Sequence, residues 1–271
     1  MPMPAKASSI RPSTAANKTH TPENDMTLHY NSDWTPHKAA DGAEPPARGI
    51  LFDMDGVLCD SEPLIAEAAC RMFAERHGVG VTAADFHPFV GTGEDRYLGG
   101  VAEKYGVTLR KPDDKARVYE IYLELIPGRL RPLPGVIEFI AAARAAGWRL
   151  AVATSADRIK MEGNLREIGL PAAMFDAVVT GEDIEHKKPA PDIFRLAARR
   201  IGAPPGRCVV IEDAVSGVTA AKAAGARCLG LTGSYPADEL RRAGADWIAD
   251  GLDRVTPALF DLTAAETSSR C

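Results

Sequence analysis

Four short apolar runs, each followed by a loop that carries polar side chains, constrain the fold of this chain most. The runs are residues 49–52, 148–153, 175–180 and 208–211. Buried strands of parallel sheets have this length and this near-continuous apolar character. Polar residues at the ends of such strands gather where open α/β sheets bind ligands. The sequence therefore predicts an α/β fold, a doubly wound (Rossmann-like) parallel sheet core, with a site at the carboxyl ends of its strands.

Two aspartates follow the first run, in the segment Asp53-Met54-Asp55-Gly56. Side chains alternate along an extended chain, so Asp53 and Asp55 start on the same side, and Gly56 lets the chain turn away from them. Phosphoryl transfer through an aspartyl-phosphate needs a nucleophile and a proton-transfer group, and a shared divalent cation would keep the two carboxylates from repelling each other. The alternative is a solvated turn, since Asp and Gly favour turns.

A second acidic pair, Glu212-Asp213, follows the run 208–211 and precedes a stretch of small residues. Magnesium prefers oxygen ligands and takes one or two carboxylates plus substrate phosphate, which Asp53 and Asp213 would supply. The alternative is that the pair caps the helix through Ala220, because acidic residues favour helix N-termini.

The other two runs end in groups suited to anions. Thr154 and Ser155 follow 148–153 and precede a helix expected to begin near Asp157, so hydroxyls and backbone N–H groups would meet at a helix N-terminus. The prolines of the loop 186–192 restrict the backbone around Lys188, whose ammonium can bind phosphate as a point charge. Taken separately, Thr154 could be a helix cap and Lys188 a surface lysine, but four such loops in chain order favour a common site.

These motifs, in this order, resemble those of the haloacid dehalogenase superfamily of phosphohydrolases over residues 48–250. The segments 188–194 and 211–218 are similar to the branch that contains β-phosphoglucomutase and the CbbY-like sugar phosphatases. The segments 89–94 and 155–160 resemble the hydrolase domain of the plant suppressor-of-quenching proteins.

The resemblance implies a mechanism and a cofactor, Mg2+. Asp53 would attack phosphorus, Asp55 would protonate the leaving oxygen and later deprotonate a water, and Thr154, Ser155 and Lys188 would hold the phosphoryl oxygens. The metal ligands that it implies are Asp53, the carbonyl of Asp55 and Asp213. Glu212 would either bind the metal itself or hold one of these ligands in place.

Residues 60–133 carry apolar side chains at helical spacing and are expected to form a small helical cap domain, inserted into a core of residues 48–59 and 134–256. The repeating positions are Leu64, Ala68, Met72 and Phe73, then Leu98, Val101 and Tyr105, then Val118, Ile121, Tyr122 and Leu125. A glycine-containing loop, 87–94, interrupts this pattern. It would either reach over the site and select the substrate or simply connect two helices. The candidate specificity residues are Gly91, Thr92, Gly93, Glu94 and Arg96.

The cap departs from the pattern of β-phosphoglucomutase. Where the mutase has an arginine for the second phosphate, this chain has Glu94, with Arg96 offset by two, and Ile65 stands where the mutase has a cap histidine. Hydrolysis of a small phosphorylated metabolite, such as a sugar phosphate, is therefore favoured over a phosphomutase. A non-catalytic binding or regulatory module is the second alternative, and a dehalogenase would need neither Asp55 nor a metal.

Composition limits the partners. The net charge of −5 argues against nucleic acid, and no apolar run approaches the roughly 18 to 20 residues that cross a bilayer. The five cysteines form no C-x-x-C pair, as expected in a reducing compartment, so we expect a cytoplasmic location. We separately expect a monomer. Residues 1–47 have the composition of a disordered tail and loosely resemble an organelle transit peptide, which leaves organelle targeting as an alternative. Residues 257–271 are expected to be a C-terminal tail.

Overall fold

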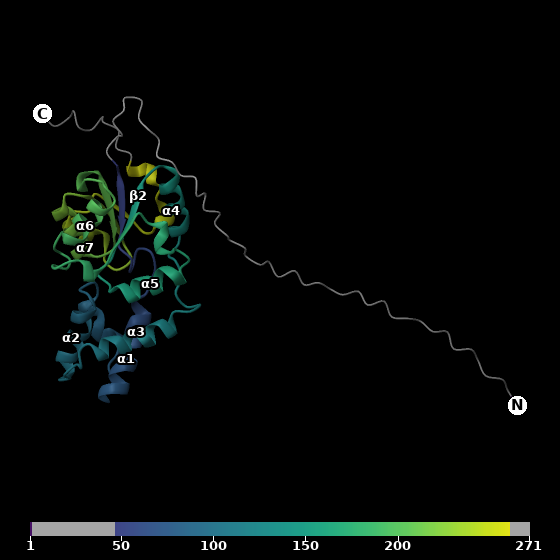
Figure 1. The fold of residues 1–271 in the computed structure, drawn as a ribbon, viewed down its shortest axis with the longest axis vertical. Helices are drawn as coiled ribbons and strands as arrows, with labels where there is room; N and C mark the ends of the chain where they lie inside the picture. Colours follow the sequence, from purple (N-terminus) through teal and green to yellow (C-terminus); the bar gives the residue numbers. More distant parts are fainter. Residues whose placement is uncertain (2–46, 261–271) are drawn as a thin grey trace, which may run out of the picture. The chain divides into compact units, whose positions relative to one another are not determined.

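The computed structural model describes Met1 and residues 47–260, and its centre is a six-stranded parallel sheet with the strand order β3-β2-β1-β4-β5-β6 (Figure 1). The strands are β1 (Gly49–Phe52), β2 (Arg149–Ala153), β3 (Ala177–Val179), β4 (Cys208–Glu212), β5 (Arg227–Leu231) and β6 (Trp247–Ala249). The four predicted runs form β1 to β4. No apolar run predicted β5 or β6, because the run of β5 is interrupted by a glycine and that of β6 is short.

Helices cover both faces of the sheet, which confirms the doubly wound fold. Ile50 and Phe52 of β1 pack in one apolar cluster with α4 (Val136–Ala145), while Leu51 packs in the other with α6 (Asp192–Arg200) and α7 (Val215–Ala224). Figure 1 shows α6 and α7 on one side of β2 and α4 on the other. This alternation places successive side chains of a buried strand in opposite layers.

The direction of the chain through the sheet reverses next to β1. The chain runs from β1 to β2 and β3, then crosses back to β4 on the other side of β1. Phe52 lies opposite Ile211, and the backbone N–H of Asp53 donates to the Ile211 carbonyl at 3.0 Å. The carboxyl ends of β1 and β4 therefore meet at the topological switch point, where ligands bind in open α/β sheets.

Helices fill the segment between β1 and β2, as the apolar spacing predicted. Before α4, they are α1 (Glu62–His77), the 3-10 helix η1 (Ala83–Phe89), α2 (Glu94–Tyr105) and α3 (Asp113–Leu125). Figure 1 shows α1, α2 and α3 grouped together near α5 (Arg158–Glu167). The chain enters and leaves this group through adjacent segments, because Cys59 pairs with Pro132 and the Leu133 N–H donates to the Leu58 carbonyl at 2.9 Å.

The remaining elements connect and flank the sheet. They are the helix α8 (Ala237–Ala243) and the 3-10 helices η2 (Ala172–Met174), η3 (Gly181–Asp183), η4 (Pro205–Arg207), η5 (Leu252–Arg254) and η6 (Pro257–Phe260). In the part of the chain that the structure describes, no helix is long and apolar enough to cross a membrane.

The start of the expected C-terminal tail is ordered, which corrects that boundary. Residues 257–260 form η6, and Phe260 is buried against the rings of Phe139, Trp148 and Trp247. Burial of a large aromatic ring is favourable enough to hold this turn on the core. The expected N-terminal tail, apart from Met1 and Ala47, and residues 261–271 lie outside the described residues.

Candidate active site

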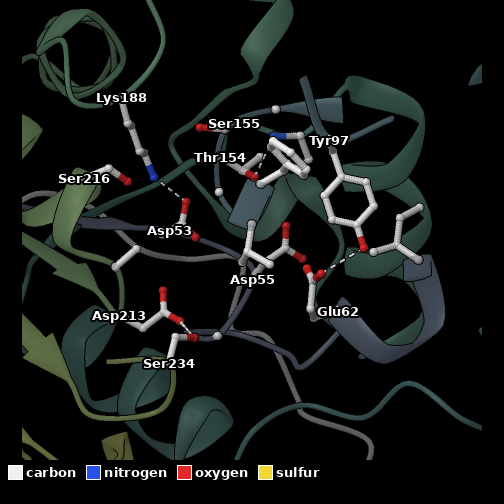
Figure 2. A pocket seen from close by; sticks show the side chains of 18 of the residues that line it. Asp53, Asp55, Glu62, Tyr97, Thr154, Ser155, Lys188, Asp213, Ser216 and Ser234 are labelled. Carbon is white, nitrogen blue, oxygen red and sulfur yellow. Dashed lines mark hydrogen bonds and ion pairs between the residues drawn. The ribbon is translucent and has the colours of Figure 1, made fainter. Parts of the chain in front are cut away.

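One pocket lies at the carboxyl ends of the strands, bordered by the N-terminal ends of α1, α2 and α5. All the core site residues predicted from the sequence line it: Asp53, Asp55, Thr154, Ser155, Lys188, Glu212 and Asp213. Figure 2 shows most of these side chains around the same space. The four strand-end loops thus converge, and the interpretation of each as a separate cap or surface residue does not explain their shared location.

Lys188 joins two acidic side chains at the base of the pocket. Its ammonium donates to Asp53 Oδ1 and, at 2.6 Å, to Glu212 Oε1. The three side chains are almost fully buried. Burial opposes the charge on Lys188, but Asp53 and Glu212 hold its pKa above the ordinary value. Lys188 is thus a fixed cation, not the solvated surface lysine considered as an alternative.

Glu212 is fixed by hydrogen bonds to the Lys188 ammonium and to the backbone. Its Oε2 accepts hydrogen bonds from the backbone N–H groups of Asp213 and Ala214 at 3.0 and 2.9 Å. A Cβ at Gly217, in the first turn of α7, would lie 1.7 Å from Glu212 Oε1, so only glycine leaves room for this carboxylate. Glu212 therefore fixes the turn that leads into α7 and orients Lys188.

Asp213 lies against the turn that follows β1. A Cβ at Gly56, where φ is +77°, would lie 1.9 Å from Asp213 Oδ2. The same oxygen accepts a hydrogen bond from the Ser234 hydroxyl, as Figure 2 shows. Gly56 thus serves both the positive φ of the turn and the close approach of the second acidic motif.

Asp55 is held from the opposite side. Its Oδ2 lies 2.8 Å from the Lys160 ammonium on α5, and its Oδ1 accepts from the Ser61 hydroxyl. In Figure 2 its side chain points toward Glu62 and Tyr97, whereas Asp53 faces Lys188. The two aspartates of the first motif thus belong to two separate ion-pair networks within one pocket.

Hydroxyl groups complete the site near the end of β2. Thr154 Oγ1 accepts from the Ala156 N–H at 3.1 Å, which leaves its own hydrogen free to donate. Ser155 Oγ is buried and has no hydrogen-bond partner among the described residues. Both positions fit a ligand oxygen placed between the end of β2 and Lys188.

The loop before α2 borders the pocket, as the lid interpretation requires. Gly91, Gly93 and Glu94 line it, but Thr92 and Arg96 do not. Thr92 turns inward to donate to the Phe89 carbonyl at 2.6 Å, and the Arg96 guanidinium pairs with Glu103 at 3.0 Å on the surface of α2. The structure thus gives Thr92 and Arg96 no direct contact with the pocket space.

Several pocket residues were missed from the sequence. Lys160 lies in the segment 155–160 named above for its resemblance, but no chemical role was predicted for it, because a lysine in the first turn of a helix is usually solvated. Ser234 could have been found, since it follows the strand β5, whose run was not recognised. The other missed residues are Asp60, Glu62, Tyr97, Ser216 and Tyr235.

The chemistry of these donors fits a divalent cation. Asp53 and Glu212 share the Lys188 ammonium, while Asp213 has no basic partner within ion-pair distance among the described residues. Burial together with the neighbouring carboxylates raises the pKa of Asp213 well above its ordinary value. Burial also raises the pKa of Asp53, although Lys188 opposes this shift. Within residues 47–260, no three His, Cys, Asp or Glu side chains form a cluster that could hold an ion by themselves. Magnesium does not need one, because water and substrate phosphate complete its shell.

Several known hydrolases and phosphatases are similar to this chain. Residues 47–225 match the haloacid dehalogenase-like hydrolase family. Protein SUPPRESSOR OF QUENCHING 1, chloroplastic, from Arabidopsis thaliana is 46% identical over 76% of this chain, which spans only 20% of that much longer protein. Protein CbbY from Cereibacter sphaeroides is 35% identical, with 79% of this chain and 97% of the relative covered.

A further relative and a solved structure cover whole proteins. Hexitol phosphatase A from Escherichia coli is 31% identical over 77% of this chain and 93% of its own length. The crystal structure of CbbY from Rhodobacter sphaeroides in complex with phosphate superposes with a TM-score of 0.72 at 32% identity, covering 80% of this chain and all of that one. A monomeric state and a cytoplasmic location stay predictions.

Proposed function

This chain belongs to the haloacid dehalogenase-like hydrolase family, and from that premise we propose that it is a magnesium-dependent phosphatase that hydrolyses a small sugar phosphate or related ester. The observation that carries the proposal is the Lys188 ammonium bound to Asp53, because it places a fixed cation beside a buried carboxylate at the switch point. The names of two relatives, the hexitol phosphatase and the phosphate-bound CbbY, support phosphate esters as the substrate class.

In the first step of the proposed mechanism, an Asp53 carboxylate oxygen forms a bond to phosphorus and the bond from phosphorus to the ester oxygen breaks. Asp55 gives its proton to the leaving oxygen. Lys188, Thr154 and Ser155 stabilise the negative charge on the phosphoryl oxygens. Most of the rate in such reactions comes from positioning and electrostatic stabilisation, which fixed buried donors provide.

In the second step, a water attacks the phosphorus of the aspartyl-phosphate on Asp53, and Asp55 takes a proton from that water. Inorganic phosphate then leaves and Asp53 is regenerated. Magnesium, when bound, would neutralise charge between the phosphoryl group and the carboxylates. Asp53, Asp213 and the Asp55 carbonyl would hold it, while Glu212, whose oxygens already accept three hydrogen bonds, would position Lys188.

We further propose that residues 60–133 act as a cap domain over a core of residues 48–59 and 134–256. The loop before α2 approaches the core closely, since a Cβ at Gly93 would meet the Lys187 side chain at 3.6 Å. Closure of this loop would exclude water while the aspartyl-phosphate forms.

The test is phosphate release from an aryl phosphate and several sugar phosphates by the purified chain, with magnesium or a chelator. Asp53→Asn should reduce release to background, because the amide is a poor nucleophile, while Asp113→Asn, at an exposed position of α3, should keep full activity. Release that persists in Asp53→Asn would refute the assignment of the nucleophile. The absence of release from every ester by the folded wild-type protein would favour the non-catalytic module instead.

A further inference from the structure

The end of the pocket that faces α1 and α2 is acidic, and this property bears on the substrate. The carboxylates that line it are Asp55, Asp60, Glu62 and Glu94. Among the described residues, the pocket has only two basic side chains, Lys160 and Lys188, and no arginine. Lys188 is already bound at the opposite end, so Lys160 alone faces the acidic group.

Lys160 is not available to a second anion. It is 4% exposed, and its ammonium lies 2.8 Å from Asp55 Oδ2 and 3.7 Å from Glu94 Oε1. One ammonium thus serves two carboxylates, while Glu62 accepts a hydrogen bond from the Tyr97 hydroxyl at 2.9 Å. An anionic group on the organic part of a substrate would meet several carboxylates without a free cation, and like charges at close range repel.

One carboxylate oxygen of Glu94 has no hydrogen-bond donor among the described residues, and a bound ligand could supply one. Glu94 is 8% exposed and lines the pocket, and its Oε2 accepts no hydrogen bond from any described residue. A buried carboxylate oxygen in this state is unfavourable, so a donor is expected there when the site is filled. A hydroxyl suits it better than a second ammonium, because Lys160 lies beside the other oxygen of the same carboxylate and would repel a cation.

We propose that Glu94 accepts a hydrogen bond from a hydroxyl group of the substrate, so that the enzyme takes monophosphate esters of neutral polyhydroxylated compounds and rejects esters that carry a second anionic group. This inference rests on the proposed phosphatase function. The acidic end of the pocket would select the organic part of the substrate, whereas the opposite end would bind the phosphoryl group.

The decisive comparison uses two esters of the same carbon skeleton. Sorbitol 6-phosphate and 6-phosphogluconate differ at carbon 1, which is a hydroxymethyl group in one and a carboxylate in the other. At pH 8, where Glu94 is ionised, the wild-type kcat/KM should be about 10 to 100 times higher for sorbitol 6-phosphate, the range expected for a hydrogen bond to a charged group. Glucosamine 6-phosphate and glucose 6-phosphate form a second pair, in which no preference for the amine is expected.

Variants of Glu94 separate charge from shape. Glu94→Gln should lower the preference for sorbitol 6-phosphate over 6-phosphogluconate at least about tenfold, because the amide keeps the size but not the charge. Glu94→Asp should retain the rejection of 6-phosphogluconate while lowering kcat/KM for sorbitol 6-phosphate. The matched control, Glu103→Gln, changes an exposed glutamate on the same helix and should leave the ratio unchanged.

The outcomes distinguish this inference from the function on which it rests. Hydrolysis of an aryl phosphate and of sorbitol 6-phosphate, with 6-phosphogluconate hydrolysed equally well, would overturn the inference and leave the phosphatase intact. At least tenfold preference for the amino sugar phosphate would overturn it in favour of a cation site. No hydrolysis of any ester, the aryl phosphate included, would overturn both proposals. If Glu94→Gln does not fold by circular dichroism, the two wild-type comparisons and Glu94→Asp still decide.

Discussion

Replacement of Glu94 by glutamine should stabilise the protein, by an amount that grows with pH. Burial, opposed in part by Lys160, raises the pKa of Glu94 from 4.5 to about 7. The folded protein therefore binds this proton more tightly than the unfolded chain. Between pH 4.5 and 7 the unfolded chain releases the proton first, so the free energy of unfolding of the wild type falls as pH rises through this window.

The size of the effect follows from the shift. Each pKa unit corresponds to about 1.4 kcal/mol, so the shift lowers the free energy of unfolding by about 3 kcal/mol at pH 8, where the folded protein must ionise Glu94. At pH 5 it lowers it by about 1 kcal/mol, because the folded protein keeps a proton that the unfolded chain has largely released. Glutamine has no charge to bury and has nearly the size of glutamate. The free energy of unfolding of Glu94→Gln should thus exceed that of the wild type by about 1 kcal/mol at pH 5 and by about 3 kcal/mol at pH 8.

Urea unfolding followed by circular dichroism, from pH 5 to pH 8 in the absence of substrate and metal, measures this difference. Glu103→Gln is the control, because its surface ion pair with Arg96 should contribute at most about 1 kcal/mol, with little pH dependence over this range. A difference between Glu94→Gln and the wild type that stays constant from pH 5 to pH 8 would refute the reasoning. A wild type that is the more stable protein at pH 8 would refute it as well, since Glu94 would then be stabilised as a carboxylate by Lys160.

Three further predictions concern the catalytic end of the pocket. Gly217→Ala should lower kcat/KM about 100-fold, because the added Cβ would displace Glu212 and with it Lys188. The helical control Gly99→Ala has open space at its Cβ and should keep full activity. Equal activity in the two variants would contradict the role of Glu212. Asp55→Asn should lower kcat by about 100-fold to 10,000-fold, measured as phosphate release, and a variant within tenfold of the wild type would exclude Asp55 as the acid and base. Chelation should abolish phosphate release, and added magnesium should restore it. Magnesium should also raise the melting temperature, because the ion binds the folded state. Full activity in excess chelator would argue against a metal.

The local sequence was sufficient to predict the catalytic end of the pocket. Asp53, Thr154, Lys188 and Asp213 each follow an apolar run, and in a parallel sheet the ends of neighbouring strands must meet. Their convergence is thus a consequence of strand direction and topology, both of which short apolar runs joined by helical segments indicate. The strand β5 escaped prediction, and Ser234 with it, because Gly230 interrupts its apolar pattern.

The rest of the site was decided by packing between distant segments. Lys160 and Glu94 are separated from Asp55 by 105 and 39 positions. The loop 87–94 predicted a specificity role for Glu94, but nothing in the local sequence indicated that either side chain is buried beside Asp55. They are buried only because α2 and α5 pack over the turn after β1, and burial is what leaves Glu94 Oε2 without a partner. The polar residues at strand ends can be predicted from the sequence, because each follows an apolar run in the same short segment. The acidic end of the pocket required the tertiary structure, because burial and charge pairing depend on neighbours that the sequence order does not specify.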